Sequence, residues 1–376
     1  MDILSEIKTA LDNLERVVIA TTITSSGSTP LPSGAVLVFK PVGEIVIGTV
    51  GGGILEARVI DQVKAMVSQR GASFVLTFEL SDTKSEGGMI CGGSVDVLFE
   101  VIEDSDRLIF SKLHSARHEG QDCALLRMLD ERQTVIDRMV LENLSTGTHL
   151  LEQSAPLRGK LQISPDDFSK AIERTHRQEV PVRIPGKSGE LLLQPIAGLQ
   201  PLIVFGGGHI ARAVSQIASA AGFRVTIVDD REEYANPRRF PDAVRIILMP
   251  IDVAFDHFEI KDSTSVVIVT RGHQLDGEVL ARAIKTSARY IGMIGSKRKV
   301  IATYERLLQD GVSLDALKRV HAPIGLDIGA VTAEEIAVSI VAELIRVRRG
   351  MEKPSVPMSE SVKPWFNKQG GGSGTY

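Results

Sequence analysis

Cysteine is scarce in this chain of 376 residues, which has only Cys91 and Cys123. Two cysteines are too few for a disulfide framework or for a zinc site built on cysteine ligands alone. Aromatic residues make up 5% of the chain, and its formal net charge is −4. Because a nucleic-acid groove normally combines a basic patch with stacking aromatic rings, this composition argues against a nucleic-acid partner.

Long apolar runs are also absent. No segment approaches the roughly 20 apolar residues that a membrane-spanning helix needs. Residues 2–14 have the pattern of an amphipathic helix rather than that of a signal peptide. The sequence therefore predicts a cytoplasmic protein without a membrane partner. Its length exceeds what one ordinary core supports, which favours two domains.

The first part of the chain mixes short strands with helices. Strands are expected at 16–23, 35–39, 44–50, 73–79 and 94–102. Pro41 and Gly43 separate the second and third of these strands, which are therefore expected to form a hairpin. Prolines and glycines between 181 and 195 indicate a linker or an irregular hairpin. We predict an N-terminal mixed α/β domain that spans residues 1–197, linker included.

From Pro201 onward, apolar strands alternate with helices. These strands are expected at 201–205, 223–228, 245–249, 265–270 and 289–294. Alternation of this kind is typical of parallel strands joined by helical crossovers. We therefore predict a Rossmann-like doubly wound parallel sheet over residues 198–350, which makes the fold class α/β. The polar, glycine-rich segment 351–376 is expected to be a disordered tail.

The most informative motif is a glycine-rich turn of the form G-x-G-x-x-A, which runs from Gly206 to Ala211 between an apolar strand and a helical pattern. A second strand follows and ends in Asp229-Asp230. In this context glycines allow close backbone approach, the helix start offers free N–H groups, and an acidic residue about 20 positions on can bind ribose hydroxyls. The residues predicted to bind a nucleotide or phosphate are Gly206, Gly208, His209, Asp229 and Asp230. The alternative is a turn that serves packing only.

Two later loops leave the edge of the predicted sheet at which open α/β folds bind ligands. Arg271 and His273 follow the fourth strand, where they could hold phosphate or substrate, or simply lie in a solvated loop. Ser296 and Lys297 follow the fifth strand, and Lys297 begins a run of three cations. Because cations oppose the dipole at a helix start, an anionic ligand would relieve a local conflict. These four residues are added to the predicted ligand site.

A second glycine-rich turn lies in the N-terminal half. Gly51, Gly52 and Gly53 stand between a strand and a helix, and Glu56 falls in the first turn of that helix. The backbone of such a turn could form another anion-binding cradle. The alternative is equally compatible with the pattern: glycines permit a sharp turn, and an acidic residue complements the helix dipole.

Cys91 lies in the glycine-rich segment 87–93 together with Gly92. Backbone amides in such a loop could lower the pKa of a thiol, and a soft ligand could approach closely. Cys91 is therefore predicted to contact a cofactor or a metal, the alternative being a small buried side chain. Cys123 lies in an apolar segment and is expected to belong to the core.

These segments together resemble the XdhC/CoxI family, the accessory factors of xanthine dehydrogenase. The N-terminal blocks that carry the resemblance are 49–53, 55–56 and 91–93. The C-terminal blocks are 205–211, 228–231, 240–241, 270–273, 291–297 and 323–330. Position 54 is isoleucine where the family pattern often has cysteine, which leaves Cys91 as the thiol ligand.

The resemblance implies a cytoplasmic chaperone that binds molybdenum cofactor and protects it while its terminal oxo ligand is replaced by sulfur. The chaperone then delivers the cofactor to an apo-molybdenum hydroxylase of the xanthine dehydrogenase kind. The glycine turns and nearby cations would hold the phosphate of molybdopterin or an attached nucleotide, and Cys91 would contact the metal. A cysteine desulfurase and a second copy of the chain, in a homodimer, are the other expected partners. In this role the protein is a carrier, and no catalytic residue is assigned.

Two other functions remain compatible with the sequence. The first is an NAD(P)-dependent oxidoreductase whose N-terminal domain supplies substrate contacts and acid/base groups. The first half shows no evident histidine–carboxylate pair of the kind that hydride-transfer enzymes use as a general base, which favours the carrier. The second is a regulatory module that senses a nucleotide, and such a module would not need Cys91.

Overall fold

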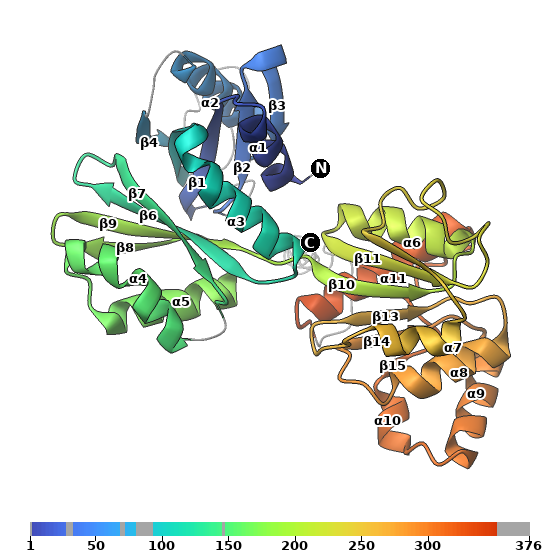
Figure 1. Cartoon of the computed structure of the whole chain (residues 1–376). Helices are drawn as coiled ribbons and strands as arrows, with labels where there is room; N and C mark the ends of the chain where they lie inside the picture. The colour runs from blue at the N-terminus through green and yellow to red at the C-terminus, as the bar shows by residue number, and fades with distance from the viewer. Residues whose placement is uncertain (1, 28–32, 68–71, 80–92, 145–146, 352–376) are drawn as a thin grey trace, which may run out of the picture. The chain divides into compact units, whose positions relative to one another are not determined.

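The computed structural model describes residues 2–27, 33–67, 72–79, 93–144 and 147–351 (Figure 1). The chain divides into two compact units, Met1–Leu199 and Gln200–Tyr376. Almost all of the predicted tail, from residue 352 onward, lies outside the described residues. Within the described part, no helix combines the length and the apolar character needed to cross a membrane.

The first unit contains a five-stranded antiparallel sheet in the order β3-β2-β1-β5-β4. Its strands are β1 (Val17–Gly27), β2 (Val36–Lys40), β3 (Ile45–Gly48), β4 (Ser73–Glu79) and β5 (Gly93–Ile102). The predicted hairpin is confirmed as β2–β3, whose connection is the short 3-10 helix η1 (Val42–Glu44). Helix α2 (Gly53–Met66) packs on this sheet through Leu55, Val59 and Val63.

A second antiparallel sheet in this unit has the order β7-β6-β9-β8. Its strands are β6 (Cys123–Asp130), β7 (Val135–Glu142), β8 (Val182–Gly186) and β9 (Gly189–Ile196). The other helices of the unit are α1 (Ile3–Asp12), α3 (Arg107–His118), α4 (Gly147–Leu161) and α5 (Pro165–Gln178), with the 3-10 helix η2 at Asp104–Asp106. Helices α1 and α3 share one apolar core with β1 and β6, which belong to different sheets. Cys123 is buried in that core, as expected, and burial raises the pKa of its thiol to about 12.

A buried ion-pair network connects the two sheets. Glu100 of β5 is completely buried, and its carboxylate pairs with Arg127 of β6 at 2.8 Å and with Arg138 of β7 at 3.0 Å. Arg138 also pairs with Asp106 at 3.2 Å, and Arg127 donates to Gln194 Oε1 at 2.7 Å. Burial alone would raise the pKa of Glu100, but the two guanidinium groups hold that pKa below its usual value. Glu100 is therefore an ionised carboxylate inside the fold.

The second unit is built on a six-stranded parallel sheet in the order β12-β11-β10-β13-β14-β15. Its strands are β10 (Gln200–Phe205), β11 (Phe223–Asp229), β12 (Arg245–Leu248), β13 (Ser265–Ile268), β14 (Tyr290–Met293) and β15 (Val320–His321). Numbered within the unit, the order is 3-2-1-4-5-6, that of doubly wound dinucleotide-binding folds. The predicted Rossmann-like sheet is thus confirmed, with β15 as an addition that the sequence did not indicate.

Helices cover both faces of this parallel sheet (Figure 1). Helices α6 (His209–Ala220) and α11 (Ala333–Arg348) pack on one face, and α8 (His273–Ala283) and α9 (Lys297–Gln309) pack on the other. The shorter helices are α7 (Ile251–Ala254), η3 (Phe255–His257) and α10 (Leu314–Lys318). Helix α11 begins with a capping box, because Glu335 N donates to Thr332 Oγ1 and Thr332 N donates to the Glu335 carboxylate.

A buried carboxylate anchors the loop that follows β15. Glu343 of α11 accepts hydrogen bonds from Tyr290 Oη at 2.6 Å and from Gly325 N at 2.9 Å, and it lies 3.0 Å from His321 Nδ1. Burial alone would raise the pKa of Glu343, but these three contacts hold that pKa below its usual value. The loop from residue 323 to residue 330 is therefore tied to the end of the sheet and to α11.

Candidate cofactor-binding site

The predicted nucleotide-binding residues lie at the carboxyl edge of the parallel sheet, where the strand order reverses between β10 and β13. Helices α6, α8 and α9 begin at this edge, directly after the neighbouring strands β10, β13 and β14. Their N-cap residues are Gly208, Gly272 and Ser296, and no described side chain caps these helices. By contrast, Ser313 and Thr332 cap α10 and α11. Three helix N-termini at one edge therefore leave N–H groups for an anionic ligand.

The three glycines of the turn after β10 have different surroundings. Gly206 has a φ of +114°, and a Cβ there would lie 2.4 Å from the carbonyl oxygen of Val269. A Cβ at Gly207 would lie 2.4 Å from the carbonyl oxygen of Tyr234. At Gly208 a Cβ would meet no atom within 4 Å. The first two glycines are therefore required by packing, and the third is where the backbone is open to a ligand.

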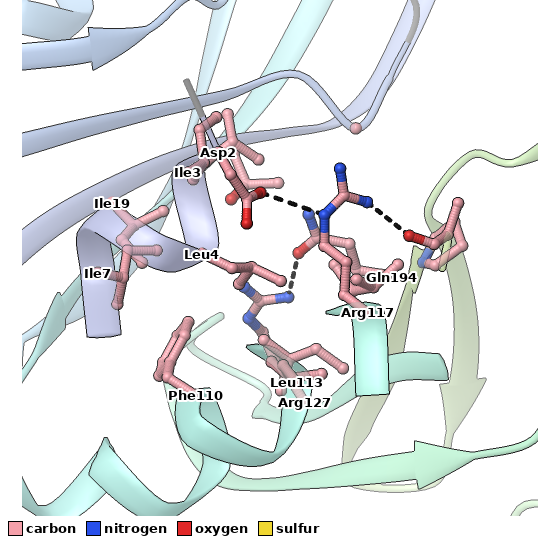
Figure 2. Close-up of a pocket in the computed structure, with 17 residues that line it drawn as sticks. Asp2, Ile3, Leu4, Ile7, Ile19, Phe110, Leu113, Arg117, Arg127 and Gln194 are labelled. Atoms are coloured by element: carbon pink, nitrogen blue, oxygen red, sulfur yellow. Dashed lines mark hydrogen bonds and ion pairs between the residues drawn. The ribbon is translucent and has the colours of Figure 1, made fainter. Parts of the chain in front are cut away.

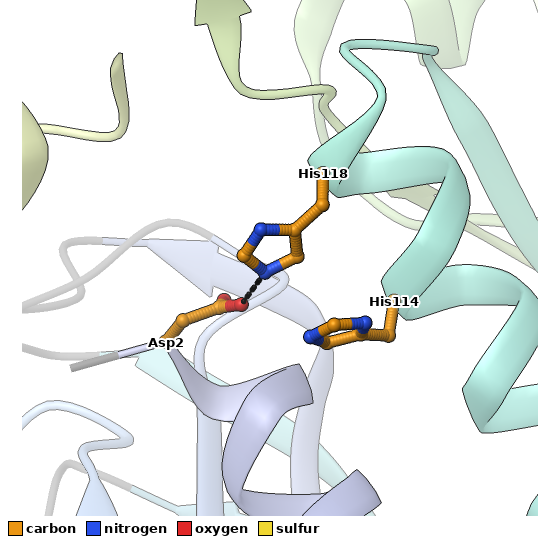
Figure 3. Close-up of side chains that lie close together, drawn as sticks. All are labelled: Asp2, His114 and His118. Carbon is orange, nitrogen blue, oxygen red and sulfur yellow. Dashed lines mark hydrogen bonds and ion pairs between the residues drawn. The ribbon is translucent and has the colours of Figure 1, made fainter. Parts of the chain in front are cut away.

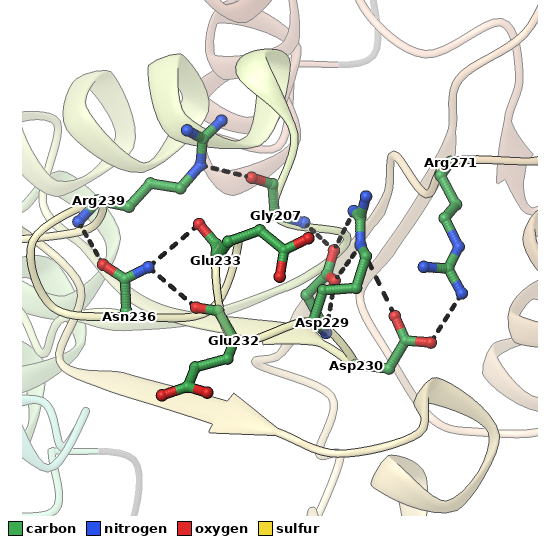
Figure 4. A network of polar contacts seen from close by, with 9 residues as sticks. Gly207, Asp229, Asp230, Glu232, Glu233, Asn236, Arg239 and Arg271 are labelled. Atoms are coloured by element: carbon green, nitrogen blue, oxygen red, sulfur yellow. Dashed lines mark hydrogen bonds and ion pairs between the residues drawn. The ribbon is translucent and has the colours of Figure 1, made fainter.

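Asp229, at the end of β11, is buried and binds the turn itself (Figure 4). Its carboxylate accepts a hydrogen bond from Gly207 N at 2.7 Å and from the backbone and side chain of Arg231 at 2.9–3.1 Å. Burial alone would raise the pKa of Asp229, but Arg231 and the Gly207 amide hold that pKa below its usual value. Asp229 thus positions the glycine turn, and a direct contact with ribose stays a prediction.

Asp230 is more exposed and joins two loops of the site (Figure 4). Its carboxylate lies 2.8 Å from Arg271 Nη2, in the loop after β13, and 3.9 Å from Arg231 Nε. Arg239 donates to a carbonyl of the glycine turn at 2.8 Å, and both Arg231 and Arg239 lie over the ring of Tyr234. Neither arginine was predicted from the sequence to belong to the site. Arg231 could have been predicted from the sequence, because it directly follows the acidic pair Asp229-Asp230. No feature of the sequence near Arg239 indicates that its side chain contacts the glycine turn.

The remaining predicted residues of the second unit lie at the starts of helices at the same edge. His209 is the first residue of α6 and is exposed. Ser296 and Lys297 begin α9, are exposed, and have no acidic residue beside them in the first turn. His273 begins α8, but its side chain lies outside the described part of the chain.

The glycine turn of the first unit is also held by a carboxylate. Gly51, Gly52 and Gly53 have φ angles of 130°, 74° and 60°, a run that only glycine adopts without strain. Glu56 accepts hydrogen bonds from Val50 N at 3.2 Å and from Gly52 N at 3.3 Å. Its carboxylate also accepts a hydrogen bond from the hydroxyl of Thr49. A Cβ at Gly52 or Gly53 would meet nothing within 4 Å, so this turn too has an open face. Cys91 and Gly92 lie outside the described residues.

The first unit contains a histidine–carboxylate pair that was not predicted from the sequence. His118 Nε2 lies 3.1 Å from Asp2 Oδ2 (Figure 3). Because 116 residues separate the two side chains, their spacing carries no signal. The lack of such a pair therefore no longer counts against an oxidoreductase.

Comparisons with known proteins agree with this architecture. Residues 202–344 match the XdhC Rossmann domain and residues 10–79 match the XdhC and CoxI family, and together they cover more than half of the chain. A probable xanthine dehydrogenase subunit of Bacillus subtilis is 26% identical over 341 residues, which is 90% of this chain and 95% of that protein. The uncharacterized protein YqeB of Escherichia coli is 33% identical over 174 residues, and the match covers 44% of this chain and 32% of that protein.

A third relative is the molybdenum cofactor insertion chaperone PaoD of Escherichia coli, which is 25% identical over 154 residues, or 41% of this chain and 42% of that protein. The matches to YqeB and PaoD thus span less than half the length of those two relatives. A crystal structure of a xanthine dehydrogenase from Bacillus halodurans has a TM-score of 0.72 at 24% identity, with 96% of this chain and 99% of that chain covered, and so shares the fold. From the two matched regions, the chain belongs to the XdhC and CoxI family.

Proposed function

We propose that this chain is an accessory protein that binds molybdenum cofactor, holds it during sulfuration, and inserts it into a xanthine dehydrogenase-type hydroxylase. Support comes from relatives named as a molybdenum cofactor insertion chaperone and as part of a probable xanthine dehydrogenase. The observation that carries the proposal is the edge where three uncapped helix N-termini meet an open glycine position. In this proposal the protein acts in the cytoplasm as a homodimer, and a cysteine desulfurase supplies the sulfur.

The residues at this edge suit the phosphate of molybdopterin or an attached nucleotide. The N-terminus of a helix carries a partial positive charge and unpaired N–H groups, and α6 and α9 both begin here. Gly208 leaves space at the start of α6, while Ser296 and Lys297 add an exposed hydroxyl and a cation at the start of α9. When bound, the cofactor would supply the molybdenum centre on which a hydroxylase depends.

The acidic residues of the site do not oppose an anionic ligand. Asp229 is paired with Arg231, and Asp230 is paired with Arg271. Each negative charge is therefore matched by a cation within hydrogen-bonding distance, and Lys297 is an additional cation. An exposed edge of this kind also suits a carrier, because a hydroxylase that buries the cofactor more completely binds it more tightly and can take it over.

Gly208→Val is expected to remove ligand binding without unfolding the second unit. Position 208 has a φ of −67° and open surroundings, so valine fits the chain but covers the amides that would meet a phosphate. We expect at least a tenfold loss of affinity for molybdenum cofactor in calorimetry, about 1.4 kcal/mol, with nearly unchanged thermal unfolding. Gly159→Val is the matched control, because position 159 is equally open and lies in the first unit. Unchanged affinity of Gly208→Val for the cofactor and for every nucleotide tested would make the turn purely structural.

Reconstitution tests the carrier function itself. Apo-hydroxylase is mixed with sulfurated molybdenum cofactor, with and without this protein, and we expect clearly higher hydroxylase activity when the protein is present.

An NAD(P)-dependent oxidoreductase is the second candidate, favoured by the strand order of the parallel sheet and by the pair of His118 with Asp2. Two results together would contradict the carrier function and support the oxidoreductase. They are equal hydroxylase activity in both mixtures and steady oxidation of NADH or NADPH when the protein alone is given a small carbonyl substrate.

A further inference from the structure

Two histidines of α3 and the aspartate that precedes α1 come together in the first unit (Figure 3). His114 and His118 are four residues apart, so they lie on the same face of the helix, and their ring centroids are 4.2 Å apart. The possible ligand atoms of His114, His118 and Asp2 all lie within 4.8 Å of one another. This cluster is separate from the residues assigned to the cofactor.

Both imidazole rings contact the hydroxyl of Ser5, and the ring of His118 also contacts a carboxylate oxygen of Asp2. Asp2 Oδ2 lies 3.1 Å from His118 Nε2 and accepts a hydrogen bond from Ser5 Oγ at 2.9 Å. His114 Nε2 lies 3.2 Å from the same Ser5 hydroxyl. The other carboxylate oxygen, Asp2 Oδ1, accepts a hydrogen bond from Arg117 Nε at 3.1 Å. Arg117 therefore fixes the carboxylate with Oδ2 toward the histidines, as the outer partners of metal ligands commonly do.

We infer that His114, His118 and Asp2 form a binding site for a divalent transition-metal ion such as Zn²⁺. Imidazole nitrogen and carboxylate oxygen are usual donors for this ion, with bonds of about 2.0–2.2 Å, which places tetrahedral ligands about 3.3 Å apart. The three donors already lie within 4.8 Å of one another, so small side-chain rotations bring them to that spacing. The Asp2 and His118 side chains are 25% and 34% exposed, so an ion can reach them from solvent.

A cavity of about 290 Å³ in the same unit is lined by Asp2 and Arg117 (Figure 2). Arg127 and Gln194 also line this cavity, as does Thr21, whose buried hydroxyl has no hydrogen-bond partner among the described residues. A buried polar atom without a partner indicates a place for a small polar ligand or water. Three protein ligands leave a tetrahedral ion one further position, which is the arrangement of catalytic rather than structural zinc sites. Of the three inferred ligands, Asp2 lines this cavity, so the cavity and the inferred metal site share one carboxylate.

Zinc titration of the untagged full-length chain, first treated with a chelator, tests this inference. All titrations use a Cys91→Ser background so that zinc bound to that thiol does not contribute, since Cys123 is fully buried. We expect one equivalent of Zn²⁺ to bind, and we expect His114→Ala and His118→Ala each to weaken binding at least tenfold. His149→Ala is the matched control, because it removes an exposed histidine from α4.

Thermal unfolding of the same proteins supplies a second readout. Without metal, the histidine variants should melt as cooperatively as the control, which shows that they fold. Zinc should then raise the melting temperature of the His149→Ala control but not that of the other two variants. Absence of zinc binding, or equal zinc affinity in His114→Ala and His149→Ala, would overturn the inference. Either result is independent of whether the protein carries molybdenum cofactor.

Discussion

Replacing Glu100 by glutamine is expected to lower the free energy of unfolding by about 3–5 kcal/mol. The substitution keeps the shape of the side chain but leaves the buried Arg127 without a counter-charge, and it leaves Arg138 paired with Asp106 alone. Urea unfolding followed by circular dichroism measures the loss. Tryptophan fluorescence is not used as the signal, because the single tryptophan, Trp365, lies outside the described residues. Hydrogen exchange of β5 and β6 should show that the loss arises where the two sheets of the first unit are joined.

The matched control is Asp96→Asn in the same unit. Asp96 pairs with Arg183 at 3.2 Å, but their side chains are 23% and 30% exposed, so water screens the pair and a loss of about 1 kcal/mol or less is expected. Because folding lowers the pKa of Glu100, its stabilising charge is present above the ordinary pKa of the carboxyl and is lost as the pH falls through the lowered value. The difference between wild type and Glu100→Gln should therefore shrink at acidic pH. A loss no larger than that of the control would mean that this charge does not hold the sheets together.

Much of the second unit could be predicted because its strands are buried on both faces and therefore appear as apolar runs. The five runs from residue 201 to residue 294 correspond to β10–β14. Strand β15 contains only Val320 and His321, and two residues cannot display a periodic pattern. In the first unit the strands β1–β5 were predicted, but the division of the unit into two sheets was not. Pairing partners depend on tertiary contacts rather than on the pattern of a single strand.

The site was harder to predict than the fold because its contacts join distant segments. The glycines after β10 predict a turn, and the acidic pair after β11 predicts a nearby carboxylate. Whether Asp229 faces a ligand or the turn depends on its hydrogen bond of 2.7 Å to Gly207, which spacing cannot specify. In the same way, the four-residue spacing of His114 and His118 places them on one face, but nothing in the sequence brings Asp2 to them.

Replacing the first or the third glycine of the turn after β10 by alanine should lower the free energy of unfolding by very different amounts. Gly206→Ala is expected to destabilise the second unit by roughly 3–5 kcal/mol. Alanine there would meet an unfavourable φ of +114°, and its Cβ would lie 2.4 Å from the Val269 carbonyl oxygen, a backbone atom that cannot rotate away. Gly208→Ala should cost about 1 kcal/mol or less, because an N-cap position with a φ of −67° and open space tolerates a methyl group.

Thermal unfolding of the two alanine variants, with hydrogen exchange of β11 and β13, measures this difference in the unit where it should arise. Gly206 N donates to the Val228 carbonyl oxygen at 2.8 Å, and Val269 N donates to the Phe205 carbonyl oxygen at 2.9 Å. A shift at position 206 should therefore be transmitted to β11 and β13, the strands on either side of β10, and faster exchange is expected in these two strands of Gly206→Ala only. Equal stability of the two variants would show that the Val269 segment moves aside at little cost. Packing would then not explain the glycine at position 206, and close approach of a ligand would become the reason for it.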